Sequence, residues 1–456
     1  MTWESYRDQI AADGVAALPE QVTRLRADPA RIEALQRDGL TRLLRHAVKH
    51  SAFHRERLSA IDLTAVTPAD LSAIPVMTKA EMMASLDDVL TDPRITHDRA
   101  EQALSETADV PVPIDDEFLT MATGGSSGRR AIIVYDRAAL VGYLCCLARP
   151  MAARLQEVAG DGPLPTLTLA MVAAASPKHA TQAMAHFAAG ALPFRFDHVP
   201  ATLPLAEIVD RLNAIQPPAL MGYASMINRL ALEQRAGRLR IAPLSVSATS
   251  ETLDNAMRAT IADAFGVAPT NTFGSTEGLV GASTPGGEAI VFNSDYCIVE
   301  LVDDDYRPVA FGEPSSRILV TNLYNLAQPL IRYEITDRFQ QVPDANGTGL
   351  LNAIVHGRAE DVLQFGSVGV HPHAVTTVMV SVSEVADYQV FQTASGLRLN
   401  VIADAALDES ALAQALRSSL VRAGLENPTV DVQRVDELER NEKTGKVRRF
   451  VPFANG

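Results

Sequence analysis

The sequence of 456 residues predicts an α/β protein, on the strength of three observations. Apolar runs typical of strands alternate with helical patterns from about residue 164 to residue 265, which predicts a largely parallel sheet with helices on both faces. Beyond residue 289 the pattern changes to strands, which predicts a β-rich subdomain. The segment of about a hundred residues after Arg358 combines strands with one helix, which predicts a small α+β domain.

Each element is predicted from hydrophobic spacing and from start and stop signals. Residues 1–60 are expected to be helical, because residues 40–49 carry apolar side chains at helical spacing. Thr78, with Glu81 three residues later, is typical of a capping box at a helix start. The acidic, proline-containing stretch 101–116 predicts a connecting loop.

The remaining predicted elements complete the three regions. Helices are expected at 138–151, 180–189, 205–215, 224–234, 253–265 and 409–423. Strands are expected at 164–174, 217–223, 244–249, 289–292, 296–302, 317–321, 388–392, 397–402 and 429–433.

Charge and cysteine usage limit the partners. The formal net charge of −15 argues against a broad nucleic-acid surface, which needs a basic face. The N-terminus has no signal-peptide pattern, and the longest apolar run, around residues 167–175, is too short to span a bilayer. Three cysteines without a Cys-x-x-Cys pair indicate a reducing compartment. We therefore expect a cytoplasmic protein with no nucleic-acid and no membrane partner.

Residues 120–130 form a glycine-rich stretch between two β-prone runs, 117–122 and 131–135. The pattern predicts a strand, a glycine loop and a second strand. Glycines allow the backbone to curl so that successive N–H groups converge on an anion, and neighbouring hydroxyls add donors. A phosphate cradle is one interpretation, and a polar hairpin turn is the other. The stretch lacks the Gly-x-x-x-x-Gly-Lys-Ser/Thr pattern of a Walker loop.

Four further stretches carry charged and hydroxyl side chains beside turns: 271–277, 332–337, 356–361 and 442–449. Together with the glycine-rich stretch, in this order, they resemble the adenylate-forming superfamily over nearly the whole chain. Residues 43–54, 74–79 and 220–225 resemble the phenylacetate–coenzyme A ligase family within it, although Ala224 stands where that family has proline.

The resemblance implies a fold of two parts and a reaction in two halves. Residues 1–358 would form a large adenylate-forming domain of layered α/β sheets plus the β-rich subdomain, which binds ATP and the acid. Residues 359–456 would form a mobile α+β domain that carries the catalytic lysine. A small carboxylic acid, expected to be aromatic, would attack the α-phosphate of ATP to give acyl-AMP and pyrophosphate. The thiol of coenzyme A would then displace AMP.

The resemblance also implies cofactors and partners. ATP, Mg²⁺ and coenzyme A are the expected cofactors, and a homodimer is the expected assembly. One alternative is an adenylating enzyme that passes the activated group to an amine, a carrier protein or another nucleophile. A further alternative is a nucleotide-binding protein without turnover.

Site residues are assigned by position in the motifs. Lys446 would bridge the acid and the α-phosphate, Glu277 would bind Mg²⁺, and Glu360 would be the hinge acid. Asp337 would accept hydrogen bonds from the ribose hydroxyls, with Arg358 assisting. The β- and γ-phosphates would be held by Thr123, Gly125, Ser126, Ser127 and Gly128. Other nucleotide contacts would come from Ser250, Glu251, Asn271, Phe273, Gly274 and Thr276. The acid would be bound by Gly222, Tyr223, Ala248, Phe273 and Gly274.

The chain departs from the family pattern at three further places. Arg129 and Arg130 replace the usual Lys-Pro. The positive charge is kept, but a planar guanidinium group would bind phosphate through two hydrogen bonds, whereas a lysine ammonium group acts as a point charge. Gly124 stands where the family has serine. Residues 367–371 replace the usual Gly-Asn pair, which leaves the acceptor of the second half-reaction open. The alternative interpretations are that Glu277 is an ordinary surface glutamate and that Lys446 is an exposed lysine of the C-terminal tail.

Overall fold

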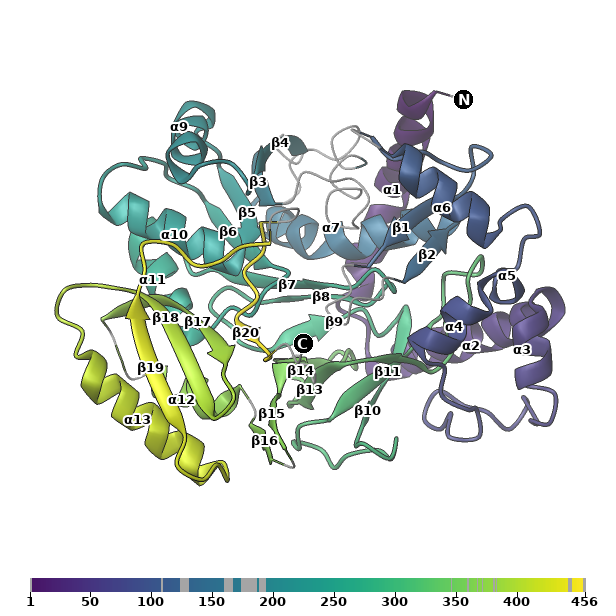
Figure 1. Ribbon diagram of the computed structural model, residues 1–456. Helices are drawn as coiled ribbons and strands as arrows, with labels where there is room; N and C mark the ends of the chain where they lie inside the picture. Colours follow the sequence, from purple (N-terminus) through teal and green to yellow (C-terminus); the bar gives the residue numbers. More distant parts are fainter. Residues whose placement is uncertain are drawn as a thin grey trace. The chain divides into compact units, whose positions relative to one another are not determined.

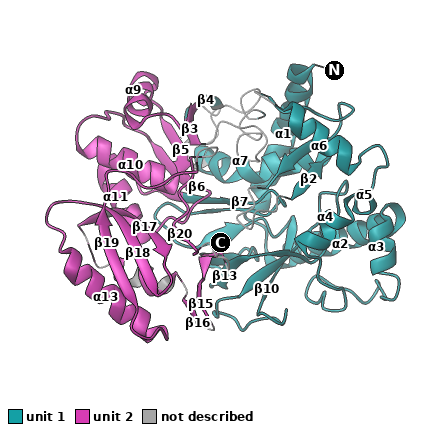
Figure 2. Ribbon diagram, in the orientation of Figure 1, with its two compact units in different colours: residues 1–169, 176–197, 271–356 teal, residues 170–175, 198–270, 357–456 magenta. Residues whose placement is uncertain are grey.

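The computed structural model describes most of the chain, which folds into two compact units (Figures 1 and 2). Unit 1 comprises residues 1–169, 176–197 and 271–356, and unit 2 comprises residues 170–175, 198–270 and 357–456. The described residues are 2–107, 110–123, 131–159, 167–173, 187, 194–345, 347–358, 361–366, 368–370, 372–379, 382, 384–441 and 445–453. The predicted domain boundary after Arg358 stays a prediction.

The helices of unit 1 begin at capping side chains. Thr2, Asp28, Ser51 and Thr96 each accept a hydrogen bond from the first helical turn, and Thr78 with Glu81 forms the predicted capping box. The helices are α1 (Trp3–Arg24), α2 (Pro29–His50), α3 (Ala52–Arg57), α4 (Lys79–Ala84), α5 (Leu86–Val89), α6 (His97–Glu106) and α7 (Arg137–Ala159).

Helix α6 corrects the expectation of a loop over residues 101–116. Ala100, Ala103 and Leu104 are buried at helical spacing, and Thr96 caps the first turn, so the helix continues to Glu106. The acidity of the stretch hid this pattern, because Glu101 and Glu106 lie within the helix itself.

The strands of unit 1 form a hairpin and two sheets. The hairpin pairs β1 (Leu119–Ala122) with β2 (Ile132–Tyr135) in antiparallel register, as predicted. One sheet has the order β13-β14-β9-β8-β7 and the other β10-β11-β12. Their bounds are β7 (Thr270–Gly274), β8 (Val280–Ser283), β9 (Ile290–Phe292), β10 (Cys297–Val302), β11 (Arg317–Asn322), β12 (Tyr333–Ile335), β13 (Asp337–Gln341) and β14 (Asn352–Arg358).

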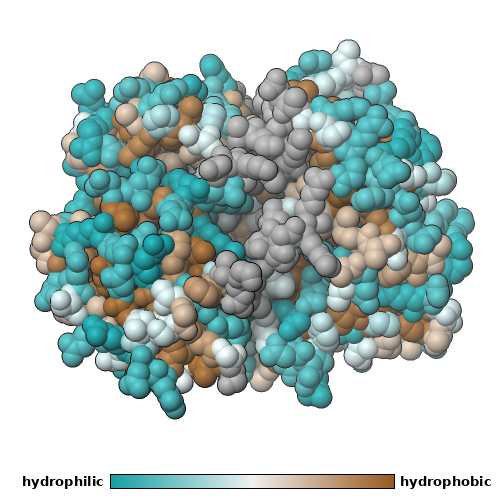
Figure 3. All heavy atoms as spheres, in the orientation of Figure 1, coloured by the Kyte–Doolittle hydropathy of each residue, from teal (hydrophilic) through white to brown (hydrophobic). Residues whose placement is uncertain are grey.

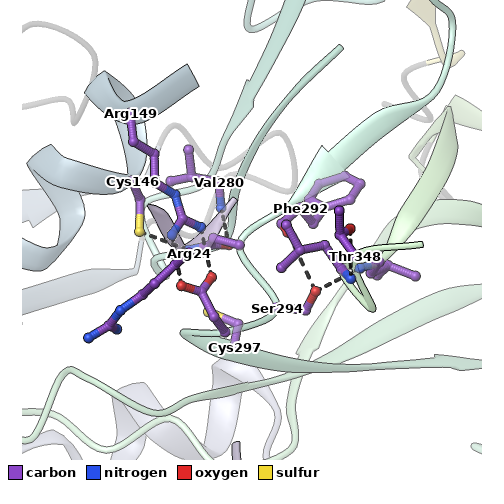
Figure 4. A network of polar contacts seen from close by, with 12 residues as sticks. Arg24, Cys146, Arg149, Val280, Phe292, Ser294, Cys297 and Thr348 are labelled. Carbon is purple, nitrogen blue, oxygen red and sulfur yellow. Dashed lines mark hydrogen bonds and ion pairs between the residues drawn. The ribbon is translucent and has the colours of Figure 1, made fainter. Parts of the chain in front are cut away.

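Helix α7 lies at the centre of unit 1. It packs against α1, and it is also the one described helix whose length and apolar composition would allow a membrane span, with half of that window buried. A buried core helix passes the same test. Arg149 of α7 forms a fully buried bidentate ion pair with Asp295, with both nitrogen–oxygen distances 2.7 Å. Figure 4 shows Arg149 and Cys146 from α7 pointing toward Cys297.

The described strands of unit 2 form three groups. The first has the order β6-β5-β3-β4, with β5 and β6 parallel, the second is the four-stranded sheet β19-β18-β17-β20, and the third is the antiparallel pair β15-β16. The first group and its helices are β3 (Leu167–Ala173), β4 (Phe194–Pro200), α9 (Leu205–Ile215), β5 (Ala219–Tyr223), α10 (Ala224–Arg235), β6 (Ser245–Thr249) and α11 (Asn255–Phe265). The C-terminal elements are β15 (Leu363–Phe365), β16 (Val368–Val370), α12 (His373–Met379), β17 (Val385–Gln392), β18 (Gly396–Ala403), α13 (Glu409–Arg422), β19 (Thr429–Arg434) and β20 (Phe450–Val451).

The four-stranded sheet buries its own core under helices α12 and α13. Leu412, Leu416 and Leu420 of α13 pack with Leu397 and Leu399 of β18. The small α+β fold predicted for this segment is therefore observed. The fold class is confirmed, and β5 and β6, within the stretch predicted as largely parallel, are parallel; the antiparallel strands β7, β8 and β9 lie beyond that stretch.

The surface shown in Figure 3 mixes hydrophilic and hydrophobic residues over the described elements. Large exposed apolar side chains come from separate elements, and single exposed apolar residues are normal. Among the described residues they are Val15, Val110, Leu244, Phe311, Val421 and Phe453.

Candidate active site

The predicted metal site lies on a turn of unit 1, Ser275–Leu279, which directly follows β7. Sequence reasoning placed a turn over residues 271–277, but β7 continues to Gly274, so the turn begins at Ser275. Gly278 occupies the left-handed region with φ of +101°, and a Cβ there would lie 2.3 Å from Nδ2 of Asn322. Only glycine fits this position, because both the backbone angle and the neighbouring side chain exclude a larger residue.

Buried side chains hold this turn by its backbone carbonyls. Four consecutive carbonyl oxygens accept hydrogen bonds from groups on α7, β2 and the segments after β9 and β11. The donors are Tyr143 to Ser275 at 2.9 Å, Tyr135 to Thr276 at 2.8 Å, Asn322 to Glu277 at 2.9 Å, and both Tyr324 at 3.0 Å and Asn293 at 3.2 Å to Gly278. The side chains of Thr276 and Glu277 therefore project from a fixed backbone.

The tyrosine hydroxyls stay protonated around the Glu277 carboxylate. Burial raises the pKa of Tyr135, Tyr143 and Tyr333 above the usual value, and the nearby negative charge of Glu277 raises each further. Two of these hydroxyls donate to backbone carbonyls of the turn, so the half-buried Glu277 carboxylate is the anionic oxygen ligand that the turn carries. Hard cations such as Mg²⁺ prefer oxygen ligands, and a carboxylate is a residue type expected at such a site.

Asp337 and Phe273 lie in the same unit as this turn. Asp337 begins β13 and is 9% exposed, and it shares a strand face with Phe339 two residues later. The ring of Phe339 lies 5.5 Å from that of Phe273 on β7, and Phe292 packs against both. The structure thus packs the ring of Phe339 on β13 against that of Phe273 on β7, three residues before Thr276.

Other predicted nucleotide contacts of unit 1 are placed with mixed outcomes. Thr123 closes the hairpin: its hydroxyl accepts the Ala131 N–H at 2.8 Å. Asn271 is half-buried with its N–H bonded to Ser283, and Gly274 is exposed. Gly125, Ser126, Ser127 and Gly128, together with Gly124, Arg129, Arg130 and the hinge candidate Glu360, lie outside the described residues.

The predicted acid-binding residues of unit 2 meet at the ends of two paired strands. Gly222 of β5 is in register with Ala248 of β6, and Tyr223 with Thr249. A Cβ on Gly222 would lie 2.7 Å from the carbonyl oxygen of Val172, so the close approach requires glycine. The carboxyl ends of parallel strands are where such sheets bind ligands.

Lys446 lies against these strand ends. Its Nζ is 5.3 Å from the centroid of the Tyr223 ring, a cation–π distance. Burial lowers the pKa of Lys446, the charge of Glu251 opposes that shift, and the charge of Arg358 adds to it. Lys446, Tyr223, Glu251 and Arg358 therefore form one cluster in unit 2. Arg358 itself is exposed at the end of β14, and its N–H donates to Asp361 at 3.2 Å.

Glu251 joins the strand ends to the lysine segment. One carboxylate oxygen accepts the Ser225 N–H at 2.9 Å, and the other accepts the Val447 N–H at 2.8 Å. Ser250, the residue before it, has φ of +64°, an unusual value for a residue with a side chain. Sequence reasoning assigned Glu251 to the nucleotide and missed both contacts, because they join residues far apart in the chain.

Comparison with known proteins identifies the fold. No family model matches the chain. The protein CapK of Staphylococcus aureus is 23% identical over 334 residues, a match that covers 70% of this chain and 65% of CapK. The structure of 2-hydroxyisobutyryl-CoA ligase in the postadenylation state with R3-HIB-AMP aligns over 93% of this chain and 90% of that one, with 17% identity and a TM-score of 0.68. The same ligase in the thioesterification state, with 2-HIB-AMP and CoA, aligns over 93% of this chain and 90% of that one at a TM-score of 0.54.

A benzoate CoA ligase from Burkholderia xenovorans LB400 is also similar, with 18% identity and a TM-score of 0.51 over 70% of this chain and 66% of that one. The chain therefore has the fold of these acid–CoA ligases, which is the fold that the resemblance to the adenylate-forming superfamily led us to expect. The narrower resemblance to phenylacetate–coenzyme A ligases stays a prediction.

Proposed function

We propose that this protein activates a small carboxylic acid with ATP as an acyl-AMP and transfers the acyl group to coenzyme A. The observation that carries the proposal is the position of Lys446, whose ammonium group lies over Tyr223 at the strand ends expected to hold the acid. Similar folds in which acyl-AMP is bound support it.

The charge of Lys446 supplies what the first half-reaction needs. When a carboxylate attacks the α-phosphate of ATP, two anionic groups approach and the phosphorus gains negative charge. A positioned ammonium group stabilises that charge in a place from which water is largely excluded. Because partial burial lowers the pKa of Lys446 and Glu251 opposes that shift, the nearby carboxylate helps keep the ammonium form.

Magnesium would be held by Glu277, and the bound ion would neutralise charge on the ATP phosphates. Among the described residues no group of three or more His, Cys, Asp or Glu side chains is placed to hold a metal. The ion would therefore take further oxygen ligands from phosphate and water. Thr276, Asp337 and Phe273 are proposed to contact the nucleotide in the same unit, together with Thr123, Gly125, Ser126, Ser127 and Gly128.

The test is pyrophosphate and AMP formation with ATP and a panel of aliphatic and aromatic acids. We expect one group of acids to release pyrophosphate without coenzyme A, and AMP to appear at multiple turnovers once coenzyme A is added. If no acid releases pyrophosphate from folded protein that binds ATP, the proposal is wrong. If acyl-AMP forms but coenzyme A does not consume it, the acceptor is an amine, a carrier protein or another nucleophile.

A further inference from the structure

The segment that carries Lys446 is folded as a small unit of its own. Asn441 N–H donates to the Lys446 carbonyl at 2.9 Å, and Gly445 N–H donates to the Asn441 carbonyl at 2.7 Å. Arg440 pairs with Val447 in a single bridge, and its Nη1 donates to the Gly445 carbonyl at 2.8 Å. These bonds fix the backbone on either side of residues 442–444, so Lys446 moves with the whole segment.

The carboxylate of Glu251 is the group that docks this segment. Ser225 is the second residue of α10, a helix start with no side-chain cap of its own, and such N–H groups need an external acceptor. Glu251 supplies it with one oxygen, which also suits the positive end of the helix dipole. Its other oxygen accepts the Val447 N–H, next to Lys446.

The backbone conformation at Ser250 sets the direction of the Glu251 carboxylate. A left-handed φ of +64° at a serine costs energy and persists only where the surrounding structure enforces it. On the other side of the segment, Gly445 has φ of +70°, and a Cβ there would lie 3.2 Å from three atoms of Ala201. The segment is therefore closely packed, and the Glu251 carboxylate beside it accepts from two donors.

We propose that Glu251 is a positioning residue whose carboxylate seats the Lys446 segment for acid activation and must release the Val447 N–H when that segment departs. The inference rests on the proposed function and assigns Glu251 a different role from the nucleotide contact expected from sequence. A carboxylate can accept two N–H bonds with its two oxygens, whereas an amide can accept with only one and would oppose a donor with its NH₂ group.

The experiment is hydrogen exchange at Val447 in the full-length protein without ligands, for wild type and Glu251→Gln. Losing one bond to a charged acceptor should open the segment roughly tenfold to a hundredfold more often and speed exchange at Val447 by that factor. Glu207→Gln is the matched control, because Glu207 belongs to the same unit and pairs with Arg211 on the surface of α9. Exchange at Val447 equal to wild type in Glu251→Gln would overturn the proposal. If that variant does not fold, Glu251→Asp decides by the same readout, since the shorter side chain keeps the charge but does not span both donors.

Steady-state kinetics distinguish two possible roles of Glu251: positioning the Lys446 segment and binding the nucleotide. In Glu251→Gln the kcat for pyrophosphate release should fall roughly tenfold or more with little change in KM for ATP, because the variant loses orientation of Lys446. A raised KM for ATP with unchanged kcat would overturn the proposal and support the nucleotide contact. If wild type releases pyrophosphate with no acid, the proposed function fails, and the exchange measurement still decides whether Glu251 seats the segment.

Discussion

The turn that carries Glu277 and the segment that carries Lys446 are held in opposite ways. Five buried side chains donate to four consecutive carbonyls of the turn, and three of the donors are tyrosines with exposed fractions of 0–9%. The lysine segment is instead docked through separate contacts: the Val447 N–H donates to the half-buried Glu251 carboxylate, Arg440 donates to Ser225 Oγ at 3.5 Å, and the Lys446 ammonium group lies over the Tyr223 ring. The first arrangement fixes a backbone permanently, and the second holds it through contacts that can be broken and remade.

This difference agrees with the two halves of the proposed reaction. A metal and nucleotide site must keep its geometry through both halves, since AMP stays bound until the acyl group leaves it. A lysine that serves only acid activation does not need to stay bound in one position through both half-reactions. Docking contacts of low stability are typical of elements that move.

Removing the ammonium group should have the largest effect on activity. We expect Lys446→Ala to lower acid-dependent pyrophosphate release by about a hundredfold to a thousandfold, the usual loss for one charge-stabilising group in an active site. Lys49→Ala, at an exposed position in the last turn of α2, is the control and should match wild type. Equal rates for both variants would place Lys446 among ordinary surface lysines.

A pH experiment tests how firmly unit 1 is packed. His54 is fully buried, and desolvation, with a smaller contribution from Arg57, lowers its pKa to about 4. At pH values between about 4 and 6.5, His54 binds a proton in the unfolded chain but not in the folded protein. The stability that is present above pH 6.5 is therefore lost as the pH falls through this range. The free energy of unfolding should drop by about 3 kcal/mol on reaching pH 4 from this residue.

Urea denaturation across that pH range measures the slope, and His54→Phe should flatten it. The exposed His97 provides the control, since His97→Asn should leave the slope as in wild type. A slope that is unchanged in His54→Phe would mean that the ring is not buried in its neutral form.

Removing one donor should weaken the Glu277 turn. In Tyr135→Phe the carbonyl of Thr276 loses a buried partner at 2.8 Å, so the free energy of unfolding should fall by about 1–3 kcal/mol. Acid-dependent pyrophosphate release should fall as well, because Glu277 loses its fixed backbone. Tyr306→Phe is the control, since that hydroxyl donates to the Glu334 carboxylate at 3.1 Å rather than to the turn. Equal losses of activity in both variants would contradict a special role for the buried tyrosines.

The smallest effect is expected from the ion pair between Arg229 and Glu437. Glu437 is 60% exposed, and such pairs contribute about 0–1 kcal/mol. Glu437→Gln should therefore change the denaturation midpoint little and leave pyrophosphate release at the wild-type rate. A marked loss of activity would mean that this pair, rather than Glu251, seats the lysine segment.

Local sequence signals predicted much of the fold. The capping box at Thr78, the helix over 205–215 and the hairpin around the glycine-rich stretch follow from residues close together in the chain, and each is observed. Strand β4 was missed because Arg195, Asp197 and His198 interrupt its apolar pattern. Helix α6 was missed because its acidic residues resemble those of a loop.

The candidate site was predicted in part. The motifs indicated Glu277, Tyr223 and Lys446, and the structure gathers Tyr223 and Lys446 in unit 2. The supports were not predictable from local patterns: Tyr324 reaches Gly278, and Val447 reaches Glu251, across 46 and 196 residues of chain. Contacts of that kind are set by tertiary packing, which a motif does not encode.

The most direct measurement is the exchange of labelled pyrophosphate into ATP by wild-type protein in the presence of Mg²⁺ and single acids. Reversible formation of acyl-AMP predicts exchange that depends on an acid, is strongest for one class of acids, and is abolished by Lys446→Ala. Exchange that needs no acid, or ATP cleavage without exchange for every acid, would contradict the account.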